Sequence, residues 1–304
     1  MGILNSEGEA PMVTAKALDW LEKNRDRRFF LWVLYTEPHR PYISHKDFTF
    51  AYQDVPASVY PPGTHMSKIK KYDSEIAYTD FYIGKLLEKL KSLGLYREAL
   101  IIFHADHGES FGEHNYFRHG RKLYNATVHV PLLVKLPLNR LEDTLRRETV
   151  SILDIGPTIL SALNIPVYPQ MEGIALFKEN TRSLARSLLL ETYGGTVHFK
   201  RSNKKFHLKV KPIRYALLNH STKIIYNLNE KTFETYSLKD DPFETKNRVK
   251  NSPAPELGKL KELLLNKITG LDKFIKYNRM HHLDNSASIS KEDLLMLKSL
   301  GYVE

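Results

Sequence analysis

The residues best suited to chemistry are Asp106 and His107, which directly follow an apolar run that begins at Ile101. Such a run predicts a buried strand, and the strands of an α/β sheet deliver the residues after their carboxyl ends to the edge where ligands collect. A divalent cation binds carboxylate oxygens and accepts imidazole nitrogen, and Gly108 lets the backbone turn away without a Cβ clash. We therefore predict that Asp106 and His107 are metal ligands. The competing interpretation is a plain strand end with a solvated carboxylate and a packed histidine.

Three further polar side chains follow 13 to 16 residues after Asp106, close enough for a loop to fold back over the same pocket: His119, Arg121 and Lys122. Hydrolysis of a sulfate or phosphate ester requires positive groups around the non-bridging oxygens and an acid for the leaving group. His119 and Lys122 are therefore candidate catalytic residues. Together with Arg121 they are also candidate contacts to an anionic substrate.

The segment DHGESFGEHNYFRHGRKLYNATVHVPLLV is similar along its whole length to part of the sulfatases and of other hydrolases of the alkaline phosphatase superfamily. The features that carry the resemblance are an acidic-His-Gly-Glu metal motif, a Gly-Glu-His loop, His119-Gly120, Leu123-Tyr124 and Val130-Pro131. Upstream, RRFFLWVLYTEPHRPY resembles the family's strand that ends in a His-x-Pro-Tyr stretch, which makes His39 a substrate-site and catalytic candidate. Segments downstream resemble sulfatases as far as the closing LLMLKSLGYVE, so nearly the entire chain is covered.

The resemblance implies a metal-dependent hydrolase of sulfate esters, with calcium as the expected metal and magnesium or manganese as alternatives. His119-Gly120 fits a His-Gly variant of the family motif. As contacts to the anionic group we therefore rank His119 ahead of Lys122, and Lys122 ahead of Arg121. The chain looks like the C-terminal two-thirds of a sulfatase, because the family's first strand and its Cys/Ser-x-Pro-x-Arg nucleophile motif are not found in it. We therefore expect incomplete activity from this chain alone, and either a complementing N-terminal segment or a homo-oligomer. The alternatives are a phosphodiesterase or phosphonate-ester hydrolase of the same superfamily, or a noncatalytic truncated member.

Several polar residues have two open interpretations. His39 lies between two prolines and could be only a turn residue, and His114 could be a loop residue or a neighbour of the metal ligands. Glu109 could hydrogen-bond the metal ligands or cap the turn. Asp80 interrupts an apolar helix face. It could be a buried partner of a site residue or a solvated carboxylate. Asp154 is predicted to be a structural acid at a helix start.

Composition is typical of a folded enzyme body: 304 residues, 42% hydrophobic and 26% charged. The net charge of +10 favours anionic partners, but no run of five basic residues occurs, and we expect no nucleic-acid binding. No 18-residue apolar segment and no signal peptide occur, so no membrane association is expected. The chain has no cysteine and therefore no disulfide, which together with these features favours a cytoplasmic protein.

Hydrophobic periodicity predicts helices over 12–25 and 69–93, a buried strand over 29–35, a strand over 130–137 and a helix over 152–165. The alternation of helices and strands predicts an α/β fold with a parallel or mixed sheet. The resemblance implies that this is an alkaline-phosphatase-like mixed, mostly parallel sheet flanked by helices. After about residue 180 the pattern changes to short strands, which predict a smaller antiparallel sheet followed by helices over 255–268 and 291–300. We therefore divide the chain into a partial α/β core, residues 1–180, and a C-terminal α+β subdomain, residues 181–304.

Overall fold

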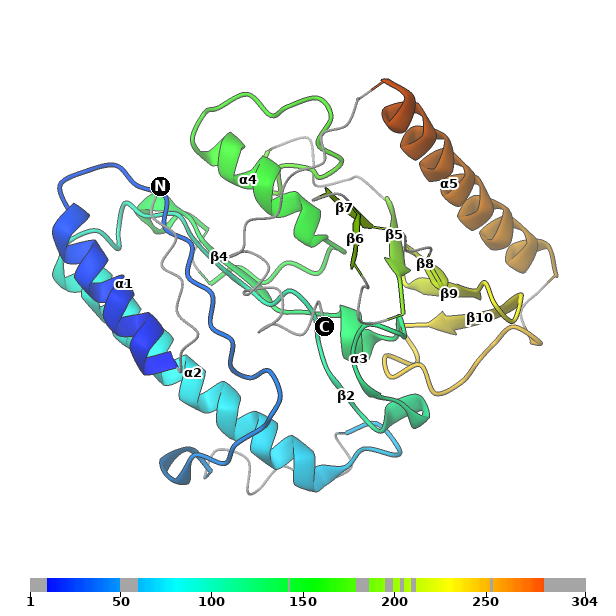
Figure 1. Cartoon of the computed structure of the whole chain (residues 1–304), viewed down its shortest axis with the longest axis horizontal. Coiled ribbons are helices and arrows are strands. Elements are labelled where there is room, and N and C mark those ends of the chain that lie inside the picture. Colours follow the sequence, from blue (N-terminus) through cyan, green and yellow to red (C-terminus); the bar gives the residue numbers. More distant parts are fainter. Residues whose placement is uncertain are drawn as a thin grey trace.

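The computed structural model describes residues 10–49, 60–141, 143–178, 186–194, 199–202, 205–208, 212–251 and 254–281 (Figure 1). Its helices are α1 (Ala10–Asn24), α2 (Met66–Ser92), α3 (Asn125–Val128), α4 (Ile155–Ala162) and α5 (Ala254–His281). Its strands are β1 (Ile101–His104), β2 (Ser110–Phe111), β3 (Phe117–Arg118), β4 (Leu132–Lys135), β5 (Ser187–Thr192), β6 (Phe199–Ser202), β7 (Lys205–Leu208), β8 (Arg214–Asn219), β9 (Thr222–Asn227) and β10 (Thr232–Ser237). Each strand pair in these described ranges is antiparallel, including β1 with β4, so the mostly parallel arrangement predicted for the core sheet is not found among the described strands.

Helices α1 and α2 lie side by side and agree with the predicted helical segments (Figure 1). Their apolar stripes recur at helical spacing, and Val13, Ala17 and Leu21 of α1 are buried. Helix α2 ends before Gly94, which has a left-handed φ of 71° and donates its N–H to the carbonyl of Lys91. The two helices thus form one side of the molecule, beside the β1–β4 pair.

The prediction of a buried strand over 29–35 is wrong. The segment is extended, but no backbone hydrogen bond joins it to any other described residue. The side chains of Phe30 and Trp32 are consequently left 64% and 68% exposed. An apolar run becomes a stable strand only when a neighbouring strand binds its backbone groups, and no strand among the described residues is hydrogen-bonded to it. The run therefore has the composition of a strand without its hydrogen bonds.

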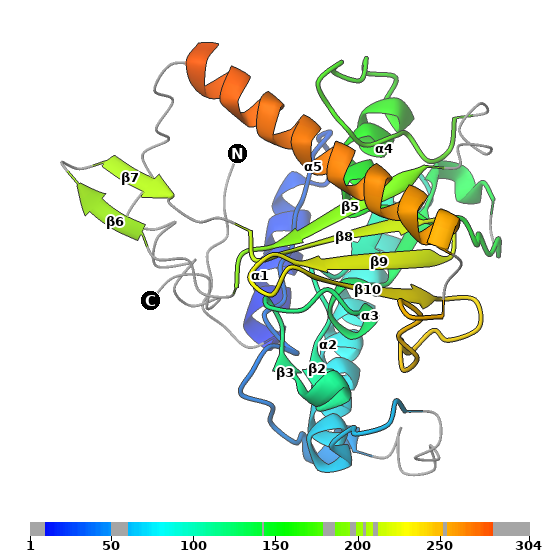
Figure 2. The same cartoon turned by 90° about the vertical axis from the view of Figure 1, so that its right-hand side faces the viewer.

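The C-terminal sheet has the order β10-β9-β8-β5 and is covered on both faces (Figure 2). On one face Tyr215, Leu217 and Ile224 pack against Leu264 of α5. On the other face Ala216 and Ile225 pack against Leu123 and Tyr124. The predicted antiparallel sheet and its helix are confirmed, and the sheet contacts the segment that follows His119.

The other predictions about individual elements have mixed outcomes. Asp154 is fully buried, accepts the N–H groups of Ser151 and Ile174, and forms an ion pair with Arg186, so its structural role is confirmed. Asp80 is exposed, which agrees with the solvated carboxylate. The helix predicted over 291–300 lies outside the described residues, and the division at residue 180 stays a prediction. None of the described helices is long and apolar enough to cross a membrane.

Candidate functional site

The site begins where β1 ends, with Asp106 and His107 on the loop that leads to β2. Asp106 Oδ1 accepts the N–H of His107 at 2.9 Å, and its Oδ2 lies 3.8 Å from His107 Nε2. Gly108 donates its N–H to the carbonyl of Thr127, and a Cβ at this position would overlap the carbonyl oxygen of Ala126. Glycine is therefore required by the close approach of α3, which fixes the backbone beside His107.

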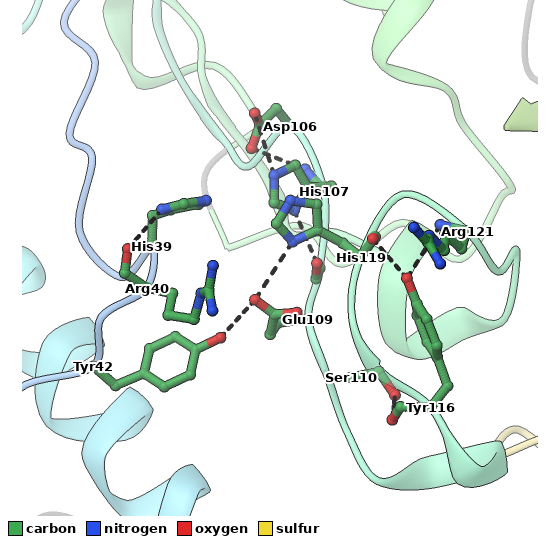
Figure 3. Close-up of polar contacts among 11 residues, drawn as sticks. His39, Arg40, Tyr42, Asp106, His107, Glu109, Ser110, Tyr116, His119 and Arg121 are labelled. Carbon is green, nitrogen blue, oxygen red and sulfur yellow. Dashed lines mark hydrogen bonds and ion pairs between the residues drawn. The ribbon is translucent and has the colours of Figure 1, made fainter. Parts of the chain in front are cut away.

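Three imidazoles that are far apart in sequence come together around this loop, and we call His39, His107 and His119 the imidazole cluster (Figure 3). The rings of His107 and His119 stack with centroids 3.8 Å apart at 26°. The ring of His39, from the loop after the extended segment, lies edge-on with its centroid 5.7 Å from that of His119. The sequence-based expectation that these side chains converge agrees with this arrangement, although their functional roles stay predictions.

Glu109 supports the imidazole cluster from below, with a side chain only 6% exposed. Its Oε2 accepts the hydroxyl of Tyr42 at 2.6 Å and lies 3.4 Å from His119 Nδ1 (Figure 3). Burial raises the pKa of Glu109, but the hydrogen bonds from His119 and Tyr42 outweigh it and lower that pKa overall. Glu109 therefore remains a carboxylate, and it orients His119 as a carboxylate orients an imidazole in many active sites.

The tautomers of two histidines follow from their neighbours, because a carbonyl oxygen can only accept a hydrogen bond. His107 Nδ1 lies 2.9 Å from the carbonyl of Gly108, and His39 Nδ1 lies 3.0 Å from that of Arg40. In both rings Nδ1 therefore carries a proton, and Nε2 is the nitrogen left for other contacts. Burial lowers the pKa of His39, and the neighbouring His119 adds to this effect, so the ring stays neutral near pH 7.

Arg121 and Lys122 make contacts outside the imidazole cluster. Arg121 Nε donates to the carbonyl of Gly194 at 2.8 Å, and Lys122 Nζ lies 5.8 Å from the ring centre of Tyr124. Arg40, which the sequence did not single out, directs its guanidinium between His39 and Glu109 (Figure 3). The signal for it was a basic residue between the histidine and the proline of the His-x-Pro-Tyr stretch.

The open interpretations of Glu109 and His114 are narrowed by their contacts. Glu109 binds His119 and Tyr42, so it joins the side chains of the site rather than capping the turn. His114 has a left-handed φ of 54° and stacks on Tyr124, with ring centroids 3.6 Å apart. Burial lowers the pKa of His114, and its ring packs at the tip of the β2–β3 loop. These contacts describe a loop residue.

The donor set at Asp106 and His107 suits a divalent cation in type but not in number. Asp106 Oδ2 and His107 Nε2 lie 3.8 Å apart, and the Asp106 side chain is 61% exposed to incoming ligands. However, the described part of the chain has no group of three or more His, Asp or Glu side chains placed to hold a metal ion. Since calcium takes six to eight ligands, these two residues alone are too few to complete a calcium site.

Comparison with known proteins places this chain in a family. Residues 10–165 match the family model described as Sulfatase, and residues 112–273 match that of the C-terminal part of N-sulphoglucosamine sulphohydrolase. Arylsulfatase K from Bos taurus is 33% identical over 111 residues, which cover 36% of this chain and 20% of the relative. The chain thus spans about a fifth of the length of that relative.

Solved structures show the same fold. One, described as a complex with its substrate D-glucosamine-2-N,6-O-disulfate, superposes with a TM-score of 0.65 at 17% identity, covering 91% of this chain and 72% of the other. The phosphonate monoester hydrolase of Silicibacter pomeroyi has a TM-score of 0.68 at 16% identity, covering 94% and 63%. The predicted alkaline-phosphatase-like fold is therefore confirmed.

Proposed function

The chain belongs to the sulfatase family, and on that premise we propose that it binds sulfate esters at the imidazole cluster for hydrolysis. One observation carries the proposal. The ring of His119 stacks on that of His107 and contacts that of His39, while its Nδ1 faces the buried carboxylate of Glu109. This arrangement presents imidazole nitrogens to an anionic ester and keeps a compensating negative charge behind them.

Each imidazole has a different task in this proposal. With Nδ1 held by Glu109, His119 has Nε2 left to contact a sulfate oxygen and to donate a proton to the leaving-group oxygen. Glu109 stabilises the protonated ring before that transfer. His39 stays neutral with its Nε2 lone pair available, so it is the group able to accept a proton from the attacking water, whose oxygen bonds to sulfur as the bond to the leaving-group oxygen breaks. Lys122 and Arg121 are secondary candidates for contacts to the substrate.

Sulfatases generally use a divalent metal, and we propose that Asp106 and His107 provide two of its ligands. Calcium is the metal expected, with magnesium and manganese as alternatives, and it would polarise the ester when bound. Further ligands must come from water or from groups outside the described residues. We propose that a complementing N-terminal segment or a second copy of the chain supplies them. We also propose a cytoplasmic location.

The test is hydrolysis of p-nitrophenyl sulfate and bis-p-nitrophenyl phosphate by the purified chain with calcium, magnesium or manganese. Variants Asp106→Ala, His107→Ala and His119→Ala are compared with His220→Asn, a control in the β8–β9 turn whose left-handed φ of 53° asparagine tolerates. Turnover that prefers the sulfate ester, and is lost in the three site variants only, supports the proposal. Preference for the phosphate diester would favour a phosphodiesterase instead.

If no turnover occurs, a measurement of sulfate binding shows whether the imidazole cluster is an incomplete active site or does not bind the anion at all. Inorganic sulfate, titrated at constant ionic strength and followed by NMR, should bind the wild type and His220→Asn equally. It should bind His119→Ala more weakly. Sulfate binding that is the same in all variants would contradict the proposed role of the imidazole cluster and favour a noncatalytic family member.

A further inference from the structure

Three consecutive backbone carbonyls at the site, those of His119, Gly120 and Arg121, are each bound by a side-chain donor. The hydroxyl of Tyr116 donates to His119 O at 2.6 Å. The hydroxyl of Thr192, at the end of β5, donates to Gly120 O, and Arg214 Nη1, at the start of β8, donates to Arg121 O at 2.6 Å. Two of the three donors thus come from the C-terminal sheet, more than 70 residues further along the chain.

These carbonyls have no partners in a helix or a strand ladder, because residues 119–124 belong to neither. Gly120 has a left-handed φ of 85°, so the backbone reverses immediately after His119. A loop without its own backbone hydrogen bonds adopts one conformation only when other groups satisfy its polar atoms. The conformation that aims the His119 ring is therefore specified by side chains outside the loop.

Thr192 and Arg214 are themselves fixed within the sheet. They are directly opposite each other in the β5–β8 pair, Thr192 is buried, and Arg214 also donates to Asn227 of β9. Arg121 returns a contact by donating its Nε to Gly194 O, just after β5. The end of β5 and the start of β8 are thus hydrogen-bonded to the loop at several points, and a rigid sheet keeps the geometry of these bonds constant.

We propose that Thr192 and Arg214 are positioning residues for His119, through which the C-terminal sheet sets the geometry of the anion-binding site. The inference rests on the proposed role of His119 in binding the anionic group. It assigns a function to the C-terminal sheet that packing alone does not require. Neither residue contacts the substrate, and both act through the backbone of residues 120 and 121.

The test is a double-mutant cycle between Thr192 and His119, read as the dissociation constant for inorganic sulfate. Thr192→Val keeps the shape of the side chain and removes the hydroxyl, whereas Thr192→Ser keeps the hydroxyl. We expect about five- to tenfold weaker binding for Thr192→Val, the effect of one hydrogen bond, which corresponds to about 1–1.4 kcal/mol. Thr192→Ser should bind within about twofold of the wild type, and Thr192→Val should add nothing in the His119→Ala background.

The outcomes separate this inference from the function on which it rests. If His119→Ala weakens sulfate binding but Thr192→Val does not, the positioning role is overturned and the proposed function stands. An equal loss from Thr192→Val with and without His119 also overturns it, since a general structural effect would be additive. If His119→Ala itself binds as the wild type does, the proposed function fails. Should Thr192→Val not fold, Arg214→Met is measured in the same cycle with the same criteria.

Discussion

Replacement of Lys223 by methionine should destabilise the protein strongly, because Lys223 is one half of a fully buried ion pair. Its side chain and that of Glu244 are each 1% exposed, and Lys223 Nζ lies 2.6 Å from Glu244 Oε1. The ammonium also donates to Asn125 Oδ1 at 2.6 Å and to Leu123 O at 3.1 Å. Burial lowers the pKa of Lys223, and the carboxylate of Glu244 opposes that shift.

The magnitude follows from what the substitution leaves behind. Methionine fills similar space, but Glu244 would keep a buried charge whose remaining hydrogen bond comes from the N–H of Asn125. Breaking a buried ion pair by removing one partner costs about 3–5 kcal/mol. For a chain of 304 residues, whose entropy of unfolding is about 0.6 kcal/mol/K, that corresponds to a decrease in Tm of roughly 5–8 °C. Much of a typical free energy of unfolding, about 5–15 kcal/mol, would be lost.

The assay is urea-induced unfolding of Lys223→Met, Glu244→Gln and the double variant, with His220→Asn as control. Glutamine keeps a carbonyl oxygen for the N–H of Asn125, so the double variant retains that bond and leaves no buried charge. We expect it to be more stable than the sum of the single effects by at least about 1 kcal/mol. A Lys223→Met protein within about 1 kcal/mol of the wild type would refute the account, as would purely additive effects.

Three further predictions concern pH, metal and packing. Burial raises the pKa of Asp73 to about 6, so the folded state binds a proton more tightly than the unfolded state, and stability should fall as pH rises from about 4 to 6. Asp73→Asn should therefore raise the free energy of unfolding by about 1–2 kcal/mol at pH 7, after allowance for solvent screening, and leave it unchanged at pH 3. Urea unfolding at both pH values measures this, and an equal increase at both would contradict the prediction. Calcium binding measured by calorimetry should be weak and lost in Asp106→Ala, since two protein ligands are too few for high affinity; submicromolar binding would disprove it. Gly108→Ala should unfold at least about 2 kcal/mol more easily, because its Cβ would overlap the carbonyl of Ala126, and unchanged thermal unfolding would show that α3 can move away.

Elements whose signal is local could be read from the sequence. Helices α1 and α2 carry apolar stripes at helical spacing, and Gly94 marks the end of α2. The capping role of Asp154 also depends on residues only a few positions away. The prediction of a strand over 29–35 was wrong for the opposite reason. A strand forms only with a neighbouring strand, and the apolar run itself does not show whether such a neighbour is present.

Only some residues of the candidate site could be named from the sequence, and their geometry could not. Asp106 and His107 stood out by type and His119 by its spacing after them, while His39 needed a family resemblance, because 67 positions separate it from Asp106 in the chain. The contact of Tyr42 with Glu109 spans 67 positions, and those of Thr192 and Arg214 with the loop span 72 and 93. Such contacts depend on tertiary packing, which no local pattern in this sequence encodes.

The extended segment over 29–35 provides the chain with an optical reporter. The protein has two tryptophans, of which Trp20 packs edge-on against Phe29 with ring centroids 5.3 Å apart, while Trp32 faces solvent. In a Trp20→Phe variant all tryptophan emission comes from the middle of this segment. A red emission maximum quenched readily by iodide would describe the segment as it stands here. A shift to the blue, or protection from iodide, would show that another polypeptide surface has covered it.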